Sequence, residues 1–320
     1  MNCIEDGWMR KVGIMSMQRI ANYGSFLQAY ALKQLIEEVG CNVEFVDYHV
    51  GAPVIAENAD SKNRVVRKIE KGLETFRYRA PLAHKLSFIR YKQSFAKKYM
   101  PFLGIAAEMN YNPTVDCLVI GSDEVFNCIQ KNSNVGYSPE LFGKNNDAKK
   151  LITYAASFGN TTLVKLEKYK KTDEVGALLK KFDAISVRDA NSGAIVEQLT
   201  GKEPVYNLDP VLTYDYMNCC DKIPQVQTNE KYLILYAYAG RISNEEADWI
   251  SDYAKKKKLK VYAIGGIQKC ADRFVDCSPF EVLTYFINAQ EVITDTFHGS
   301  IFSVITHRPF TTLIRKSVGN

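Results

Sequence analysis

Short apolar runs alternate with amphipathic stretches along most of the chain, a pattern typical of strands and helices in turn. Residues 10–17 form a short apolar run with a glycine, residues 18–24 a polar turn, and residues 25–40 repeat apolar side chains at steps of four. This order predicts a strand, a loop and an amphipathic helix that stops at Gly40. A second strand is expected over residues 42–49.

The same alternation returns further along the chain and again predicts strands followed by helices. Because parallel strands need helical crossovers, the outcome expected is a parallel sheet flanked by helices. The stretches that carry this pattern are residues 116–127, 150–159, 163–182 and 183–201, the third of them read as one long helix.

A polar, turn-rich stretch near residues 214–229 interrupts the pattern and is interpreted as an interdomain linker. A second α/β set follows it, so we expect an α/β protein of two Rossmann-like, doubly wound parallel-sheet domains. The predicted domains are residues 1–214, with a basic helical insertion near 55–105, and residues 215–320. In the second domain the expected strands cover residues 231–240, 259–266, 291–296 and 309–314, and the expected helices cover 242–258, 279–289 and 299–307.

Composition is that of an ordinary globular protein, with 46% hydrophobic and 24% charged residues in 320. No uncharged apolar run reaches the roughly 18 residues that span a bilayer, and the first residues lack the apolar core of a signal peptide. We therefore expect a cytoplasmic protein. The eight cysteines are scattered without a C-x-x-C pair, so neither a metal site nor a disulfide is predicted.

The net charge of +5 is unevenly spread, because residues 62–98 hold twelve Lys or Arg and only two acids, Glu70 and Glu74. Aromatic residues are interleaved with these cations. The segment is open to three interpretations: the solvated face of two helices, a platform for anionic lipid headgroups, or a nucleic-acid surface. Helices commonly carry basic outer faces over aromatic inner ones, which favours the first. A peripheral contact with the inner membrane face is the second, and nucleic acid is not an expected partner.

One stretch near the end of the chain, EVITDTFHGS, places one of only four histidines beside a strand end. The apolar run stops at Thr294, Asp295 and Thr296 form a turn, and a helix is expected to start at about His298 or Gly299. In open parallel sheets, ligands bind outside the carboxyl ends of strands, where helix N-termini offer N–H groups and a positive dipole end. The stretch therefore predicts a ligand site.

Three other predicted strand ends carry polar residues that could converge with it on one cleft. Asn22 and Gly24 follow the first strand, Ser122 and Asp123 follow the strand at 117–120, and Arg188 ends a fourth. Turn and N-cap roles account equally well for the first four residues.

Structural roles are also open for the two residues best suited to chemistry. Arg188 could simply pair with an acid such as Asp189 or Asp209. His298 could be a core histidine that donates to Asp295.

Six ordered blocks cover the chain from about Lys11 to Ile314: NYGSFLQAYAL, DCLVIGSDEVFN, YAASFG, ISVRDANS, NLDPVL and VITDTFHGSIFSVITHRPF. In this order and spacing they resemble the polysaccharide pyruvyl transferase family. The resemblance implies a GT-B-like protein with an active cleft between two Rossmann-like halves. It also implies transfer of the pyruvyl unit of phosphoenolpyruvate onto two hydroxyls of a sugar, which forms a cyclic ketal and releases phosphate.

The resemblance assigns roles to particular residues. His298 stands where the family's Asp-Ser/Thr-x-His-Gly motif carries its functional histidine, and an imidazole suits the proton transfers of this reaction. Asp295 is expected to orient that imidazole, Arg188 to hold an anionic group of the donor, and the N–H groups of Gly299 and Ser300 to receive phosphate. Neither a metal nor a cofactor is demanded. Further substrate contacts are expected from Asn22, Tyr23, Gly24, Gly121, Ser122, Asp123, Thr296 and Phe297.

Two departures from the family pattern keep other functions open. Thr296 and Phe297 stand where some members carry Arg-Leu, so one anion contact is absent or comes from Arg241 or Arg315. The chain also ends before relatives usually do, which makes a noncatalytic glycan-binding relative conceivable. A GT-B glycosyltransferase that uses a nucleotide sugar is the other alternative. It would need an acid to contact the nucleotide ribose in the second domain, and residues 262–269 offer none. The acceptor sugar, and whether it is lipid-linked, are not predicted.

Overall fold

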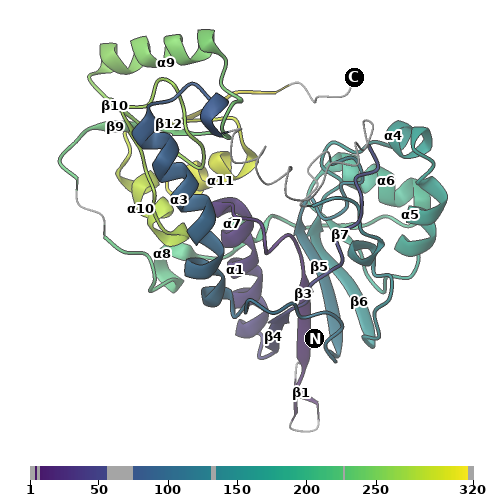
Figure 1. Ribbon diagram of the computed structural model, residues 1–320. Coiled ribbons are helices and arrows are strands. Elements are labelled where there is room, and N and C mark those ends of the chain that lie inside the picture. Colours follow the sequence, from purple (N-terminus) through teal and green to yellow (C-terminus); the bar gives the residue numbers. More distant parts are fainter. Residues whose placement is uncertain (1–3, 6–7, 56–74, 131–134, 226–227, 316–320) are drawn as a thin grey trace. The chain divides into compact units, whose positions relative to one another are not determined.

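The computed structural model describes residues 4–5, 8–55, 75–130, 135–225 and 228–315 of the chain. The chain forms two compact units, the first and the second unit, each of which is described by itself (Figure 1). The first unit comprises Met1–Ile20, Ser25–Asn58 and Met100–Tyr214, and the second comprises Ala21–Gly24, Ala59–Tyr99 and Asp215–Asn320.

The first unit is built on a six-stranded parallel sheet in the order β4-β3-β5-β6-β7-β8. The direction of winding reverses between β3 and β5, as in doubly wound folds. Central strands are almost wholly apolar and buried, because helices cover such sheets on both faces. A short antiparallel pair, β1 (Ile4–Glu5) and β2 (Trp8–Met9), precedes the sheet. The strands of the sheet are β3 (Lys11–Met15), β4 (Asn42–Phe45), β5 (Cys117–Asp123), β6 (Lys150–Ala156), β7 (Ser186–Val187) and β8 (Val205–Tyr206).

The long helix predicted over residues 163–182 is two helices, α4 (Leu163–Lys168) and α5 (Thr172–Leu179). The chain turns between them at Lys170, whose φ of 53° is incompatible with continuing a right-handed helix. The other helices with residues in this unit are α1 (Tyr23–Glu38), α6 (Ala190–Thr200), α7 (Pro210–Thr213) and the 3₁₀ turns η1 (Met100–Leu103) and η2 (Pro139–Phe142).

The second unit contains a five-stranded parallel sheet in the order β11-β10-β9-β12-β13. Its winding reverses between β9 and β12, so the prediction of an α/β fold with two doubly wound parallel sheets is confirmed. The strands are β9 (Tyr232–Tyr236), β10 (Lys260–Ile264), β11 (Arg273–Phe274), β12 (Glu291–Thr294) and β13 (Phe310–Thr312).

Helix α3 (Leu82–Tyr99) lies in the basic segment that was expected as an insertion in the first domain, but it belongs to the second unit. Its buried aromatic face explains the difference. The rings of Phe88 and Tyr91 lie 5.6 Å and 6.2 Å from the ring of Phe274, which ends β11. Burying such rings stabilises the protein by several kcal/mol. The segment therefore packs with the second unit, although the residues on either side of it in the sequence belong to the first.

The remaining helices of the second unit begin at well-formed caps. Ser243 and Glu246 form a capping box at the start of α9 (Asn244–Lys257), and Ser278 and Glu281 form another at α10 (Pro279–Asn288). The others are α8 (Tyr216–Cys219) and α11 (Phe297–Ile305). Within the described ranges, no helix combines the length and apolar character needed to cross a membrane.

Candidate functional site

The strand orders indicate where each sheet can bind a ligand. In doubly wound sheets the crevice lies at the carboxyl ends of the two strands between which the winding reverses. In the first unit these are the ends of β3 and β5, and in the second unit the ends of β9 and β12. The residues predicted from the sequence fall into two groups, one at each of these edges.

The first group is centred on Arg188, which lies between two carboxylates. Its Nη1 donates to Oδ2 of Asp209 at 2.6 Å and its Nη2 donates to Oδ1 of Asp123 at 3.3 Å. The side chains of Arg188 and Asp209 are 8% and 0% exposed. Burial alone lowers the pKa of Arg188, but the charges of Asp123 and Asp209 outweigh burial and leave it raised. One buried cation therefore faces two anions, and a third anion would find no excess positive charge here.

Hydroxyl groups complete this network. Ser122 Oγ donates to Oδ2 of Asp209 at 3.1 Å, and Ser25 Oγ donates to Oδ2 of Asp123 at 3.1 Å. The chain bends sharply at the end of β5, where Gly121 has a φ of 126°. A Cβ at Gly121 would lie 2.3 Å from the carbonyl oxygen of Tyr154, so only glycine fits.

These contacts engage Arg188 with two carboxylates, and its role as the holder of a donor anion stays a prediction. The alternative, a pair with Asp209, is the contact seen. Asp189 is occupied elsewhere, since it caps α6 by accepting from Ser192 N at 2.8 Å. The sequence predicted that Asp123 and Arg188 could converge on one cleft, but it did not indicate that they pair, because 65 positions separate them.

Replacing Arg188 by Met should destabilise the protein by about 3–5 kcal/mol, because it leaves two buried carboxylates without their cation. Urea unfolding of the intact chain measures this. Lys149→Met is the matched control: Lys149 pairs with Asp116 at 2.9 Å but is 81% exposed, so its loss should cost less than about 1 kcal/mol. If Arg188→Met instead keeps wild-type stability and loses affinity for phosphoenolpyruvate, Arg188 belongs to the anion site after all.

The second group lies at the start of α11. Thr294 Oγ1 donates to the carbonyl of Tyr236 at 2.7 Å and so ties the end of β12 to the end of β9. Thr296 is the N-cap, and its Oγ1 accepts from Gly299 N at 2.9 Å. The helix therefore begins at Phe297, one residue before the position predicted.

The same cap engages Gly299 and Ser300, for which the phosphate contacts stay a prediction. Their N–H groups both donate to Thr296, to Oγ1 and to the carbonyl oxygen, the latter at 3.3 Å. Ser300 Oγ also lies 2.8 Å from Thr312 Oγ1. Phe297, predicted as a substrate contact, is 51% exposed.

His298 lies directly against Gly24 at the start of α1. A Cβ at Gly24 would lie 2.4 Å from Cγ and 2.5 Å from Nδ1 of the imidazole, closer than real Cβ atoms approach. Asn22 accepts from Gly24 N at 2.7 Å and donates to the hydroxyl of Tyr238 at 2.9 Å. The Asn-Tyr-Gly turn and the histidine motif, far apart in sequence, thus meet in the second unit.

Tyr23, the middle residue of that turn, is a structural anchor and not the substrate contact predicted. It is 1% exposed, and its hydroxyl donates to the carbonyl of Cys277 at 2.9 Å. Its ring lies 5.2 Å from the ring of Tyr91 and 5.9 Å from that of Phe95. Burial raises the pKa of Tyr23, so it remains a neutral donor. It fixes the position of Gly24 and so of the contact with His298.

Asp295 does not have the orienting contact with His298 that was predicted. Its side chain is fully buried, and its Oδ2 lies 3.4 Å from Nε of Arg315. Arg315 in turn donates from Nη1 to Glu246 at 2.6 Å. Burial raises the pKa of Asp295 even though the charges of Arg241 and Arg315 act in the opposite direction. The carboxylate is therefore held at a cost in stability.

Arg241 differs from the other arginines of these groups in its electrostatic environment. Its guanidinium lies over the ring of Tyr238 at 4.4 Å, a cation–π contact, and the residue is exposed. In the part of the chain that the structure describes, no carboxylate approaches it within 4 Å. Arg241 therefore lacks the close carboxylate partners of Arg188, although its charge acts on the buried Asp295 from a greater distance.

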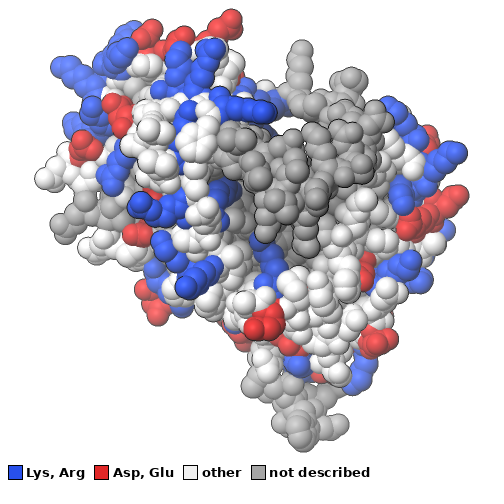
Figure 2. Space-filling model, viewed as in Figure 1, with Lys and Arg blue, Asp and Glu red and all other residues white. Residues whose placement is uncertain are grey.

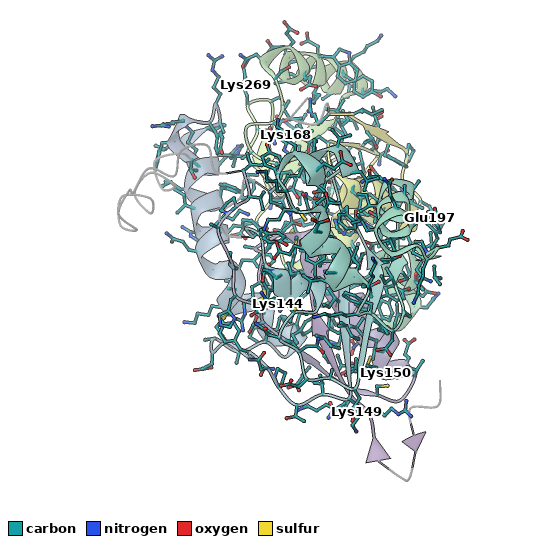
Figure 3. The ribbon with its side chains drawn as sticks, turned by 90° about the vertical axis from the view of Figure 1, so that its right-hand side faces the viewer. Lys144, Lys149, Lys150, Lys168, Glu197 and Lys269 are labelled. Carbon is teal, nitrogen blue, oxygen red and sulfur yellow. The ribbon has the colours of Figure 1, made fainter. Side chains whose placement is uncertain are left out.

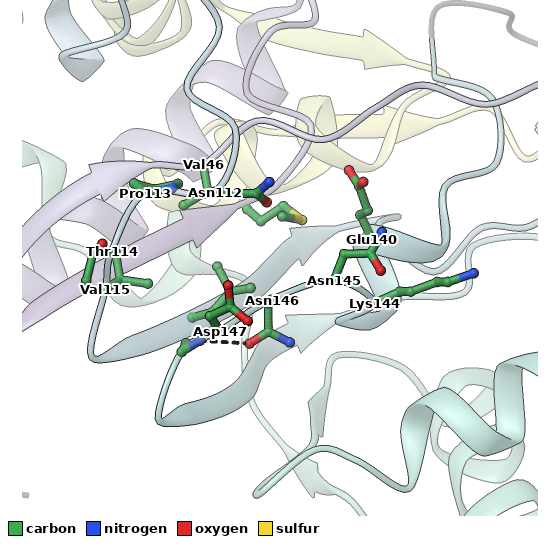
Figure 4. A pocket seen from close by; sticks show the side chains of 13 residues that line it. Val46, Asn112, Pro113, Thr114, Val115, Glu140, Lys144, Asn145, Asn146 and Asp147 are labelled. Atoms are coloured by element: carbon green, nitrogen blue, oxygen red, sulfur yellow. Dashed lines mark hydrogen bonds between the residues drawn. The ribbon is translucent and has the colours of Figure 1, made fainter.

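The described residues include no group of three or more His, Cys, Asp or Glu that could hold a metal ion. A pocket of about 90 Å³ in the first unit lies where β5 and the loop before β6 begin, lined by residues such as Asn112, Asn146 and Asp147 (Figure 4). Nearby Lys149 and Lys150 pair with acids of the same edge (Figure 3). The pocket also reaches Met15 and Val46, at the carboxyl ends of β3 and β4, but none of its lining residues belongs to either group.

A larger pocket of about 330 Å³ lies in the second unit, at the loops that follow β9 and β10 and at the start of α9. Arg77, Tyr78 and Arg79 line it from the segment that precedes α3. No Asp or Glu is among its described lining residues.

The role of Tyr238 and the partner of Asp295 had no usable sequence signal. Tyr238, which joins Asn22 to Arg241, was noted only as part of a strand. Asp209 was weighed as a partner of Arg188, and its position before Pro210 is that of an N-cap. The partner of Asp295 was equally out of reach, because Arg315 follows β13.

Asp295→Asn should stabilise the protein at neutral pH, because burial raises the pKa of the Asp295 carboxyl and so disfavours its charged form in the folded state. The raised pKa means that the protonated carboxyl suits the folded state better than the carboxylate does. That contribution is complete below the unfolded pKa and is lost as pH rises through the folded pKa, so wild type bears the cost at neutral pH. Melting curves between pH 4 and 7 should show the variant's advantage growing with pH.

Asp252→Asn serves as the control for this series, because Asp252 is 80% exposed in its pair with Lys255. It should show no comparable trend. A variant at Asp295 that is less stable than wild type at pH 7 would mean that the pair with Arg315 outweighs burial.

Comparison with known proteins gives one family and several similar folds. The family model described as polysaccharide pyruvyl transferase matches residues 22–317. No curated protein sequence matches the chain. Solved structures similar in fold include S. aureus MnaA with UDP (10% identity, 95% of this chain and 79% of that chain, TM-score 0.49) and the Methanocaldococcus jannaschii UDP-GlcNAc 2-epimerase with UDP-GlcNAc and UDP (10%, 95% and 84%, 0.44). These likenesses concern the fold alone.

Proposed function

The chain belongs to the polysaccharide pyruvyl transferase family, and we propose that it moves the pyruvyl group of phosphoenolpyruvate onto a sugar of a cell-surface polysaccharide or its precursor. The observation that carries this proposal is the contact between Gly24 and His298. Two of the motifs that define the resemblance meet there, at the strand edge where a ligand is expected. A cytoplasmic location, with no cofactor and no nucleic acid involved, is part of the same proposal.

The reaction sets the requirements of the site. One sugar hydroxyl adds to C2 of the enolpyruvyl group while C3 takes up a proton, and the hydroxyl proton is removed. A second hydroxyl of the same sugar then displaces the phosphate from C2, which gives the cyclic ketal and inorganic phosphate. The site must therefore move protons and bind a donor that carries a carboxylate and a phosphate.

His298 is proposed as the group that moves protons, since its imidazole lies at the first turn of α11. Arg241 is proposed to bind an anionic group of the donor, in place of the arginine that some relatives carry where this chain has Thr296. Arg315 is less suited to this task because Glu246 and Asp295 already share its charge. In this proposal the loop after β9 supplies the cation for the donor.

A nucleotide-sugar glycosyltransferase is the second candidate, and one observation favours it. The pocket at the start of α9 has the cations Arg77 and Arg79, which suit a phosphate-bearing ligand. Its described lining has no carboxylate to contact a ribose, which leaves pyruvyl transfer as the better-supported function. Such an enzyme would release a nucleotide from its donor and not phosphate from phosphoenolpyruvate.

Phosphate release from phosphoenolpyruvate, measured against a panel of sugar acceptors, tests the proposal. His298→Asn should lower turnover by roughly 10² to 10⁴, the usual contribution of a general acid or base, and should remove one limb of the pH–rate profile. Melting temperature and donor binding should stay close to wild type. A destabilised variant with normal turnover per folded molecule would make His298 a core residue. No phosphate release by wild type with any acceptor would favour a glycosyltransferase or a noncatalytic relative.

Gly24→Ala should lower turnover by up to about 10², because the added Cβ must push the imidazole away from its position. Gly176→Ala is the matched control. Gly176 is also helical, lies in α5, and a Cβ there would meet nothing closer than 3.6 Å. That control should keep full turnover and gain roughly 0.4–1 kcal/mol of stability. Equal turnover in both variants would show that the position of the His298 ring is not critical.

A further inference from the structure

Helix α3 presents two unlike faces. One packs into the second unit through Phe88, Tyr91 and Phe95. Residues three or four positions apart share a face of a helix, so a second stripe runs along the opposite side. In order, this outward stripe consists of Leu82, Leu86, Arg90, Gln93 and Lys97.

Apolar side chains occupy the first half of the outward stripe. Leu82 is 62% exposed and Leu86 52% exposed, and Phe76, just before the helix, is 46% exposed. A single exposed leucine is ordinary. Two successive members of one stripe, followed by cations in the same stripe, form the pattern of a helix that lies at a membrane interface.

The helix α3 and the residues just before it are rich in positive charge. Residues 75–99 contain seven Lys or Arg and no Asp or Glu. Among the described residues, no carboxylate lies within 4 Å of Arg90, Lys97 or Lys98. The blue side chains over α3 in Figure 2 stand largely apart from red ones, whereas both colours mix over α9.

Six lysines elsewhere on the described surface do have acidic partners close by. Lys11, Lys149, Lys150, Lys171, Lys260 and Lys269 each lie within 3.2 Å of an Asp or Glu oxygen. The cations of α3 that have no such partner are therefore available to water or to an anionic partner other than the described residues.

We propose that the outward stripe of α3, together with Lys98, is a contact surface for an anionic lipid bilayer. In this arrangement the helix lies along the membrane surface. Arg90, Lys97 and Lys98 reach phosphate headgroups, while Leu82 and Leu86 enter the boundary with the acyl chains. Each cation near such a surface strengthens partitioning roughly fivefold.

The same observations disfavour nucleic acid as the partner. Single-stranded nucleic acid is held by exposed aromatic rings on which bases stack. Three of the four aromatic residues of α3, Phe88, Tyr91 and Phe95, are buried, and Phe88 and Phe95 pack against β11 and Tyr23. Exposed leucines in line with the cations would make no favourable contact with a phosphodiester backbone, whereas a bilayer would bury them.

The proposal is independent of the enzymatic activity and is tested on the full chain by sedimentation with vesicles. Wild type should bind vesicles of equal parts phosphatidylcholine and phosphatidylglycerol, should bind pure phosphatidylcholine far less, and should lose binding as salt is raised. The triple variant Arg90→Gln, Lys97→Gln, Lys98→Gln should bind the anionic vesicles about a hundredfold less. Its phosphate release with a soluble acceptor should be unchanged.

The matched control removes three lysines from another helix of the same unit: Lys255→Gln, Lys256→Gln, Lys258→Gln, at the end of α9. Both triple variants lower the net charge equally, so only the position of the charges differs. The control should retain most of the vesicle binding. Equal losses in both variants, or equal binding of wild type to neutral and anionic vesicles, would overturn the proposal.

A second measurement addresses insertion. Leu82→Gln with Leu86→Gln should weaken binding to anionic vesicles severalfold at constant charge, and both sites are exposed, so folding should be retained. Unchanged binding would show that the contact is purely electrostatic and would contradict insertion of the two leucines. Binding of wild type to a DNA duplex, with none to vesicles, would assign the surface to nucleic acid.

Discussion

Parallel strands end at one edge of a sheet, and this constraint determines where chemistry can occur in the chain. Each sheet has one place where the winding reverses, and helices leave it in opposite directions there. In the first unit the edge holds a buried ionic network, and in the second it holds the histidine motif. The remaining candidate features, such as the anchoring of Tyr23 and the cap at Thr296, keep the residues of the second edge in place.

The two edges differ most in how charge is balanced. Arg188 is enclosed by two carboxylates and two hydroxyl-bearing neighbours, so its charge serves cohesion. Arg241 lies on an aromatic ring near the surface and lacks such close carboxylate partners among the described residues. A guanidinium at a strand end thus indicates an anion site only when its local charge balance is positive.

The sequence was informative where local rules decide the outcome. The alternation of strand-like and helix-like hydrophobic patterns predicted both parallel sheets. It also placed the end of β12 correctly at Thr294. It was uninformative where contacts join distant residues: the pairing of Arg188 with Asp123, the partner of Asp295, and the unit to which α3 belongs. Such choices depend on which side chains are buried together, and no window of sequence contains that information. The break at Lys170 is an intermediate case, since the stretch is a good helix former with only one residue in a left-handed conformation.

The close approach of His298 to Gly24 has an evolutionary consequence. Glycine is unfavourable by about 1 kcal/mol relative to alanine in a helix interior. Gly24 is the second residue of α1, where the penalty is smaller, but selection on stability alone would still favour alanine. It can be replaced only after the imidazole has gone or moved, which makes the two positions interdependent. A lineage that had abandoned the chemistry would be free to lose the histidine first and then fill position 24. A chain that still carries both residues retains a helix weakened in favour of the imidazole, as expected where the histidine remains under selection.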